Sequence, residues 1–240
     1  MPRAGISVDW TDALLEGLIQ LVRTPLGGPL GDCRLGDLQP GQWLNEMNFD
    51  LPLAHCAKAT EQGENRQRLV RSSGLARVFE HHAGGLFNSR YGHQLQRLDV
   101  ASRGFLTGSI DLVFCWQERW WVADWKSNWL GERDDDGSVR CCGPIHYREQ
   151  AMVELMEANH YPLQAHLYLV ALHRYLSWRL PDYDPAKHLG GYGYVFLRGV
   201  PGPINCEGRQ ASAATPGVLV DQPSLKRILA LDTLLREGQP

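Results

Sequence analysis

The stretch that decides the fold is "GSIDLVFCWQERWWVADWKSNWLG", residues 108–131. Two apolar, aromatic-rich runs flank a short polar step, a pattern typical of a β-hairpin. Charged residues nevertheless interrupt both runs, because Asp111 stands in the first and both Asp124 and Lys126 stand in the second. We therefore expect a hairpin over about residues 105–126 that places charges among Ile, Val, Phe and Trp side chains.

The three charged residues are predicted to share one face of this hairpin. Side chains alternate along a strand, so Asp124 and Lys126 point to the same face. If residues 117–118 form a two-residue turn, Asp124 is the cross-strand partner of Asp111, and their Cβ atoms lie roughly 5 Å apart. Two carboxylates so placed repel, and desolvation adds to the cost. A divalent cation removes both problems, and carboxylate oxygens suit Mg²⁺, with Mn²⁺ as a substitute.

Lys126 adds a positive charge to this acidic face. A metal ion and a neighbouring ammonium group can together activate water and neutralise the charge that develops on a phosphodiester during hydrolysis. An isolated Asp-x-Lys pair is more often a buried salt bridge, and that alternative stays open. Two carboxylates exceed what one structural ion pair needs, which favours a functional site.

The composition of the chain is that of a globular protein and does not choose a function. Of its 240 residues, 43% are hydrophobic and 21% are charged. Lys and Arg number 24 against 27 Asp and Glu, so any nucleic-acid contact must come from a local site rather than from bulk charge. No apolar run approaches the ~18 residues of a membrane span, and no signal peptide is recognisable. The six scattered Cys are typical of reduced thiols, so we expect a cytoplasmic protein without membrane contact.

The other expected elements surround the hairpin with helices. In chain order they are an amphipathic helix over about 9–23, a strand over 43–53, a polar helix-compatible stretch over 59–82, a Gly-rich bend, the hairpin, a loop over 131–146, helices near 148–160 and 162–179, a strand over 190–200 and a helix near 224–238. This order predicts an α/β or α+β fold with one central mixed sheet. No second domain boundary is visible, so a single domain over residues 1–240 is expected.

Four ordered motifs resemble a known nuclease family. The hairpin is similar to the Asp and Asp-x-Lys motifs of the PD-(D/E)xK nuclease superfamily, in the form found in the RecB family. The segments "EMNFDLPL", "DWKSNWLG", "YPLQAHLYLVALHRYL" and "DYDPAKHLGGYGYVFLRGV" resemble, in order, the C-terminal nuclease domain of RecB, the beta subunit of exodeoxyribonuclease V. The resemblance is strongest over residues 46–200 and implies a restriction-endonuclease-like sheet flanked by helices.

The resemblance implies a role for each hairpin residue that matches the family motif. Asp111 and Asp124 would be ligands of Mg²⁺. The backbone carbonyl of Trp125, where the family usually has Tyr, would join them. Lys126 would be the catalytic lysine.

Three further residues match family positions outside the hairpin. Gln164 and Tyr168 correspond to the family's Gln-x-x-x-Tyr motif, and their i, i+4 spacing places both on one helix face, where they would reach DNA or brace the site. An ordinary amphipathic helix would also explain that pair. Glu46 corresponds to an acidic position on the preceding strand. It either completes the acidic cluster as a metal ligand or is a solvated strand charge.

The chain departs from the family pattern in two respects. In RecB a helix upstream of this region supplies a histidine metal ligand in a GxxxH-like setting, and no such motif occurs before Glu46. There is also no G-x-x-x-x-G-K-[ST] motif, so neither an ATP site nor a helicase domain is expected in this chain. The sequence therefore resembles an N-terminally truncated RecB nuclease domain.

The function that the resemblance implies is a Mg²⁺-dependent DNA exonuclease domain. It would be part of a RecBCD-type helicase–nuclease that acts in double-strand break repair and recombination. Its implied partners are DNA, RecC- and RecD-like subunits and a recombinase. The alternative is an inactive nuclease-fold fragment that docks partner subunits or a recombinase.

The loop over 131–146 is longer than its RecB counterpart and carries the vicinal pair Cys141 and Cys142. Cys142 and His146 have the chemistry of zinc ligands. No second ligand pair accompanies them in the sequence, so a zinc site is not predicted.

Overall fold

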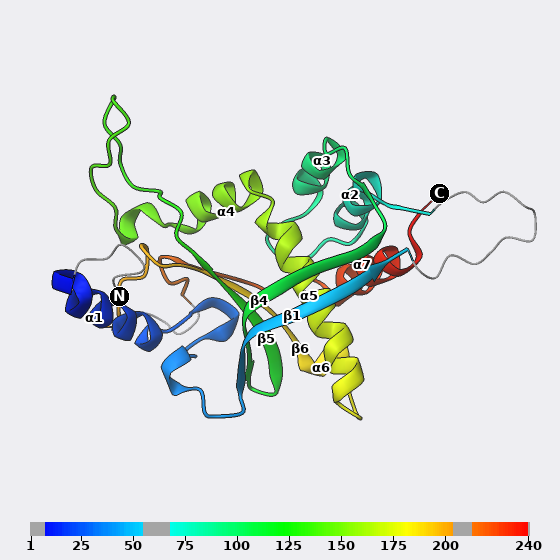
Figure 1. The fold of residues 1–240 in the computed structure, drawn as a ribbon, viewed down its shortest axis with the longest axis horizontal. Helices are drawn as coiled ribbons and strands as arrows, with labels where there is room; N and C mark the ends of the chain where they lie inside the picture. Colours follow the sequence, from blue (N-terminus) through cyan, green and yellow to red (C-terminus); the bar gives the residue numbers. More distant parts are fainter. Residues whose placement is uncertain (1–7, 55–67, 204–212, 240) are drawn as a thin grey trace, which may run out of the picture. The chain divides into compact units, whose positions relative to one another are not determined.

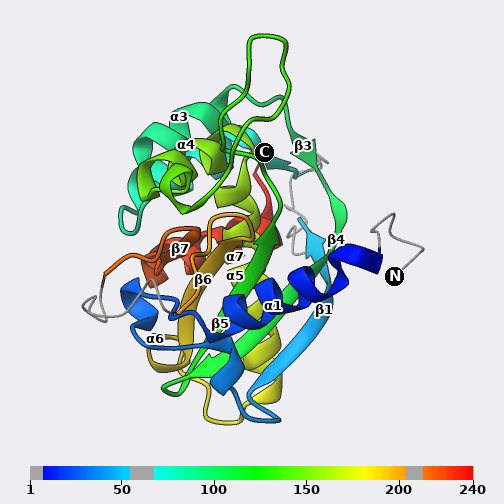
Figure 2. The same ribbon diagram turned by 90° about the vertical axis from the view of Figure 1, so that its left-hand side faces the viewer.

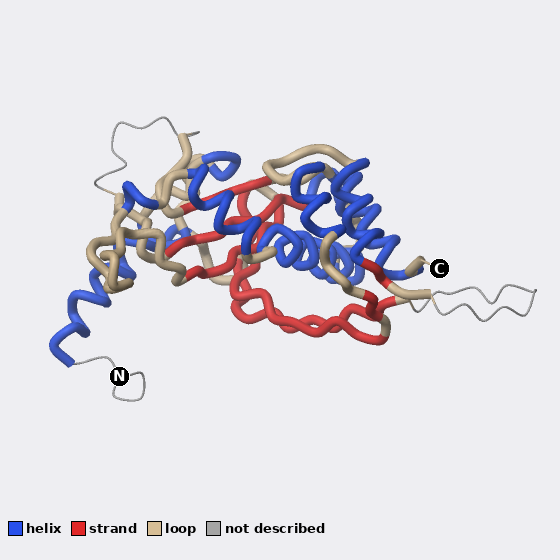
Figure 3. Tube along the Cα trace, turned by 90° about the horizontal axis from the view of Figure 1, so that it is seen from above, coloured by secondary structure: helices blue, strands red, loops and turns tan. Residues whose placement is uncertain are grey.

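The computed structural model describes residues 8–54, 68–203 and 213–239. Its α-helices are α1 (Thr11–Arg23), α2 (Ser72–His81), α3 (Ser89–Gln96), α4 (Glu149–Ala158), α5 (Tyr161–Arg179), α6 (Pro185–His188) and α7 (Leu225–Glu237). Its strands are β1 (Trp43–Leu53), β2 (Val70–Arg71), β3 (Ala101–Ser102), β4 (Gly104–Trp116), β5 (Arg119–Lys126), β6 (Leu189–Phe196) and β7 (Val218–Asp221). Figure 1 labels most of these elements, and Figure 3 colours them by type.

A five-stranded sheet is the centre of the fold. Its strand order is β1-β4-β5-β6-β7, and β2 and β3 form a separate two-stranded sheet. The predicted hairpin supplies β4 and β5, which are antiparallel neighbours in this order. The expected α/β fold, with a mixed sheet flanked by helices, is therefore confirmed and is consistent with a nuclease-like fold.

The chain divides into two compact units. Unit 1 comprises residues 1–43, 124–155 and 193–220, and unit 2 comprises residues 44–123, 156–192 and 221–240. The chain passes from one unit to the other within strands, for example between Ala123 and Asp124 on β5. The single domain over residues 1–240 stays a prediction.

Unit 2 has a helical core next to long paired strands. β1 and β4 run side by side (Figure 1 and Figure 2). α2 packs against α3 and α7, and α5 packs against α7. Aromatic rings join these helices, since the Phe79 ring of α2 meets the Tyr91 ring of α3 edge-on, with centroids 5.1 Å apart. Both rings are fully buried. Burial of apolar and aromatic side chains is the main source of the free energy that holds such helices together.

A buried arginine ties the helices of unit 2 together. Arg227 of α7 is fully buried, and its Nε donates to the carbonyl oxygen of His82 (2.8 Å) while its Nη2 donates to Oδ1 of Asn88 (2.7 Å). Its Nη1 lies 3.4 Å from Nε2 of His166, whose Nδ1 lies 2.6 Å from the carbonyl oxygen of Pro162. These contacts suit a neutral His166 that donates through Nδ1 and accepts at Nε2. Burial, and then the charge of Arg227, lower the pKa of His166 to about 3.

Unit 1 contains the first helix, whose outer face is apolar. The helix prediction over 9–23 is confirmed by α1. Leu21 is buried, whereas other apolar side chains of this segment are exposed: Trp10, Leu14, Leu15, Leu18 and Val22. We call these five residues the α1 face. No helix in the described ranges is long and apolar enough to cross a membrane.

The region after β1 differs from the sequence prediction. Residues 59–67 of the expected polar stretch lie outside the described residues, and α2 begins only at Ser72. The expected Gly-rich bend is present at Gly84 and Gly85, whose φ values are 134° and 86°, but it leads into a helix, α3, that was not predicted. Gly92 of this helix serves close packing rather than the bend. A Cβ at Gly92 would lie 2.9 Å from Cγ of Glu80 and 3.0 Å from the carbonyl oxygen of Ala76, so glycine lets α3 approach α2.

The later elements follow the prediction more closely. α4 and α5 are separate helices, and His160 between them adopts a left-handed φ of 55°. The strand expected over 190–200 is β6, which ends at Phe196, and α7 forms the expected last helix. The short elements β2, β3, α6 and β7 were not predicted, because segments of two to four residues carry no periodic pattern.

Candidate functional site

The turn of the central hairpin fixes which residues face each other. Gln117 and Glu118 both have positive φ, 50° and 63°, as a type I′ turn requires. The register pairs Trp116 with Arg119 and ends with Leu112 opposite Ala123. The two-residue turn predicted from the sequence is therefore confirmed.

The two hairpin aspartates stand at the ends of this register. Asp111 directly precedes Leu112 on β4, and Asp124 directly follows Ala123 on β5. Asp124 is 4% exposed and Asp111 is half-buried. A carboxylate at so buried a position requires a partner or a function, since desolvation of a charge is costly.

Lys126 is the observed partner of Asp124. Its Nζ lies 2.5 Å from Oδ2 of Asp124, and the two side chains are 13% and 6% exposed. The same Nζ lies 5.1 Å from the ring centroid of Tyr194 on β6, within the range of a cation–π contact. The half-buried Trp125 stands between the pair in sequence. The predicted sharing of one strand face by Asp124 and Lys126 is thus confirmed, and the contact agrees equally with a structural salt bridge.

The end of β5 is anchored within unit 1. The backbone N–H of Leu197 donates to the carbonyl oxygen of Lys126 (2.9 Å), and Arg198 donates to the carbonyl oxygen of Ser127. The hydroxyl of Tyr147 donates to the carbonyl oxygen of Asn128 (2.6 Å). These bonds hold the backbone at the end of β5, next to the ion pair.

Gln164 and Tyr168 interact with each other on α5. Nε2 of Gln164 donates to the Tyr168 hydroxyl (2.9 Å). The buried Tyr168 ring meets the Phe49 ring of β1 edge-on, with centroids 5.9 Å apart. Phe49 in turn covers Gly108 of β4, where a Cβ would lie 2.6 Å from Cζ of Phe49. These contacts brace α5 against the sheet within unit 2, whereas a role of the pair in binding DNA stays a prediction.

Glu46 lies on an irregular part of β1. Its side chain is exposed, and its φ of 52° falls in the left-handed region that non-glycine residues adopt at a cost. Strict alternation along the strand did not predict this conformation. Beyond it the side chains alternate, because Met47 and Leu51 are buried while Asn48 and Asp50 are exposed. A part for Glu46 in a metal site stays a prediction.

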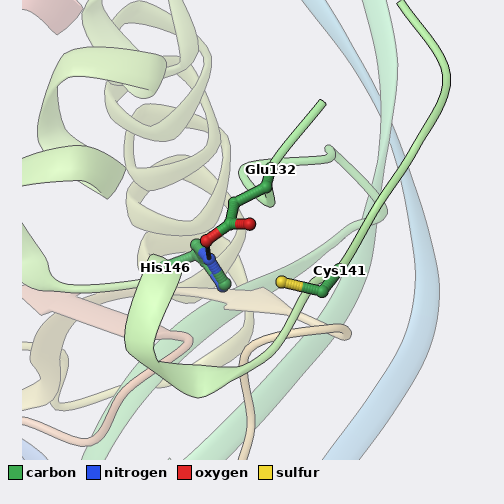
Figure 4. Close-up of side chains that lie close together, drawn as sticks. All are labelled: Glu132, Cys141 and His146. Atoms are coloured by element: carbon green, nitrogen blue, oxygen red, sulfur yellow. Dashed lines mark ion pairs between the residues drawn. The ribbon is translucent and has the colours of Figure 1, made fainter. Parts of the chain in front are cut away.

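The long loop brings together three side chains that the sequence did not single out as a set. Glu132, Cys141 and His146 each offer one ligand atom, and these atoms lie within 4.8 Å of one another. Figure 4 shows the three side chains pointing toward each other. Cys142, whose pairing with His146 in a zinc site was not predicted, contacts another residue, with its Sγ 3.3 Å from the hydroxyl of Tyr147. The segment "DDDG" at residues 134–137 is typical of a turn, and a turn there indicates that the two arms of the loop pair with each other.

Comparison with known proteins identifies relatives of the chain. No protein-family model matches it. The chain is 36% identical over 232 residues to the RecBCD enzyme subunit RecB of Mycolicibacterium smegmatis, a match that covers 88% of this chain and 20% of the relative. It is 35% identical over 241 residues to the RecB subunit of Mycobacterium tuberculosis, covering 94% and 20%, and 36% identical over 196 residues to that of Escherichia coli, covering 82% and 14%. The chain thus spans a fifth or less of the length of these curated relatives.

Proposed function

Since this chain belongs to the RecB family, we propose that it is a nuclease domain that hydrolyses phosphodiester bonds of DNA with the help of a divalent metal ion. The observation that carries this proposal is the buried Asp124–Lys126 ion pair on β5. Continuing the register of the hairpin by one step from Leu112 and Ala123 would set Asp111 opposite Asp124. Two carboxylates and an ammonium group on neighbouring strands are more than a structural ion pair requires.

The donor groups fit Mg²⁺ better than a softer ion. Asp111 and Asp124, with the carbonyl of Trp125, would hold the ion through oxygen atoms only, and Mg²⁺ prefers such ligands and keeps several waters. Glu46 on β1 is a fourth candidate ligand. When bound, the ion supplies positive charge that polarises a phosphate group and an attacking water.

The protein side chains would then divide the remaining work. Lys126 would place its ammonium group where negative charge develops on the phosphate, and its contacts with Asp124 and the Tyr194 ring keep it from leaving that position. The hydrogen-bonded pair Gln164 and Tyr168 would brace α5 beside the bound strand. In this proposal the strand supplies charge stabilisation and the helix supplies support.

The wider role that we propose follows from the relatives. The chain would act in a cytoplasmic RecBCD-type assembly for DNA repair and recombination, with RecC- and RecD-like subunits as partners. A second candidate function, docking of a partner without hydrolysis, is favoured by the exposed apolar α1 face. The two candidates differ in whether the aspartates bind metal.

The test is a substitution series assayed on linear duplex DNA. The wild-type chain is expected to degrade this DNA only when Mg²⁺ or Mn²⁺ is added. Asp124→Asn and Lys126→Gln should each reduce the rate by about 10²-fold or more, because each removes charge that acts on the transition state. Calorimetry with Mn²⁺ should show binding to the wild type and to Lys126→Gln, but not to Asp124→Asn.

Matched controls come from exposed residues of the same types. Asp182→Asn and Lys226→Gln change an exposed carboxylate and an exposed ammonium group outside the ion pair, so both should degrade DNA as the wild type does. A wild-type chain that neither binds Mn²⁺ nor cuts DNA would contradict the nuclease proposal and favour docking. Equal activity of Asp124→Asn and the wild type would exclude this site as the catalytic one.

A further inference from the structure

The loop after β5 has a defined backbone scaffold. Glu132 bonds to two neighbouring residues of the opposite arm, since its N–H donates to the carbonyl oxygen of Cys141 (2.8 Å) and its carbonyl oxygen accepts from the N–H of Arg140 (3.1 Å). Arg133 and Val139 form the next antiparallel bridge. The loop is thus a small hairpin that holds the two side chains of positions 132 and 141 next to each other.

Glycine at position 131 allows the two arms to close. A Cβ on Gly131 would lie 2.0 Å from the carbonyl oxygen of Cys141 and 2.7 Å from Cβ of Cys142. Both contacts are shorter than van der Waals separation, so a larger residue would push the arms apart. The close pairing of Glu132 with Cys141 depends on this glycine.

The third side chain, His146, is oriented by the backbone next to it. It ends a short 3₁₀-helix, Pro144–His146, and its Nδ1 lies 3.2 Å from both the N–H and the carbonyl oxygen of Gly143. Its Nε2 lies 3.9 Å from Oε1 of Glu132, and the ring is only 18% exposed. In the tautomer whose Nδ1–H donates to the carbonyl oxygen of Gly143, Nε2 carries the free lone pair for a ligand, which is the usual arrangement of metal-binding histidines.

We propose that Glu132, Cys141 and His146 bind one Zn²⁺ ion. A thiolate, an imidazole nitrogen and a carboxylate are the three ligand types that zinc takes, and zinc completes a tetrahedron with a water molecule. Zinc–ligand bonds of about 2.0–2.3 Å place the ligand atoms roughly 3.5 Å apart, so a spread of up to 4.8 Å closes with small rotations of the exposed Glu132 and Cys141 side chains. Mg²⁺ does not suit this set, because it prefers oxygen ligands.

The ion would fasten both arms of the loop to the 3₁₀-helix that precedes α4. Glu132 stands on one arm, Cys141 on the other, and His146 beyond them. Because binding of a metal to a folded site is also folding free energy, the loop should become more resistant to opening when zinc is bound. This site is separate in sequence and in ligand chemistry from the proposed Mg²⁺ ligands, so it does not rest on the proposed function.

The test uses Zn²⁺ and Co²⁺ alone as probes of the whole chain. Calorimetry should show one high-affinity Zn²⁺ per chain, and Co²⁺ should produce a thiolate-to-cobalt charge-transfer band that added Zn²⁺ removes. Cys141→Ser and His146→Ala should abolish both signals. Glu132→Gln should weaken Zn²⁺ binding by about tenfold or more. Loss of a residue that only hydrogen-bonds to a metal ligand already lowers metal affinity by about tenfold or more, and Glu132 is proposed as a ligand itself.

Cys142→Ser is the matched control, since it removes the neighbouring thiol whose Sγ faces Tyr147. It should keep the cobalt band and the Zn²⁺ affinity, and Asp124→Asn should also keep both. Trypsin cleavage after Arg133 and Arg140 should slow in the presence of Zn²⁺ in the wild type but not in Cys141→Ser. A cobalt band that survives in Cys141→Ser, or that is lost in Cys142→Ser, would overturn the assignment.

Discussion

At the scale of single residues, spacing in the sequence was enough to find one part of the candidate site. Asp124 and Lys126 are two apart on a strand, so alternation alone places them on one face, where they form the observed ion pair. The set of Glu132, Cys141 and His146 was beyond sequence reasoning, because the pairing of 132 with 141 depends on backbone hydrogen bonds within a loop. Loop backbone follows tertiary contacts rather than a periodic pattern.

His166 provides a pH-dependent prediction at the same scale. Its pKa lies at about 3 in the folded chain, below its ordinary value of 6.5. Between these two pH values the unfolded chain binds a proton at this residue and the folded chain does not. The contribution of His166 to stability is therefore complete above pH 6.5 and is lost as the pH falls from 6.5 toward 3. The free energy of unfolding should drop by about 2 kcal/mol between pH 7 and pH 5 from this residue. Urea unfolding at both pH values would measure the drop.

The comparison variant for this experiment is His166→Gln, which keeps a polar side chain between Pro162 and Arg227 but does not titrate. It should lose clearly less stability than the wild type between pH 7 and pH 5. Asp221 is present in both proteins, so its raised pKa, which burial causes, cancels in the difference. Equal losses in the two proteins would show that His166 is not the group responsible.

At the scale of elements, local apolar periodicity separates the helices that were predicted from the one that was missed. The hairpin and α1, α4, α5 and α7 were predicted because their apolar periodicity is local to each segment. α3 was missed because it is short, follows directly on the bend at Gly84 and Gly85, and contains Gly92, whose role is contact with α2. Sequence alone shows that a residue is glycine, but the neighbour that requires it comes from the fold.

Gly108 allows a test of how α5 is braced against the sheet. Gly108→Ala would add a Cβ within 2.6 Å of Cζ of Phe49 and so displace the ring on which Tyr168 packs. We expect a loss of about 1–3 kcal/mol in the free energy of unfolding, the usual cost of overpacking. Thermal and urea unfolding of the two proteins would measure it.

The matched control is Gly17→Ala in α1, where an added Cβ meets nothing within 4 Å. Alanine is a better helix former than glycine by about 1 kcal/mol, so this variant should be as stable as the wild type or more so. Destabilisation by Gly17→Ala of the same size as by Gly108→Ala would mean that contact with Phe49 is not the cause.

At the scale of the whole molecule, the chain corresponds to a minor part of its relatives, since it spans 20% of the mycobacterial RecB subunits. If its site is a working nuclease site, it should serve in place of the matching segment of such a subunit. We predict that a RecBCD enzyme carrying this chain as the replacement degrades linear DNA. The same enzyme with Asp124→Asn in the replacement should unwind DNA without degrading it.

Two measurements on that chimeric enzyme separate the outcomes. ATP-dependent unwinding reports whether the assembly forms, and release of nucleotides reports whether the inserted site cuts. Unwinding without nucleotide release by the chimera that carries the wild-type chain would contradict the proposed nuclease function and leave the docking role.

The α1 face also governs how the protein behaves as its concentration changes. Trp10, Leu15 and their apolar neighbours are exposed to water. The free energy therefore falls when the α1 faces of two molecules pack together and leave the water. Such self-association grows with protein concentration and weakens on cooling, because apolar burial is favoured by entropy near room temperature. Dilute, cold samples should therefore scatter little light, and warming a concentrated sample should make it turbid well before the fold itself is lost.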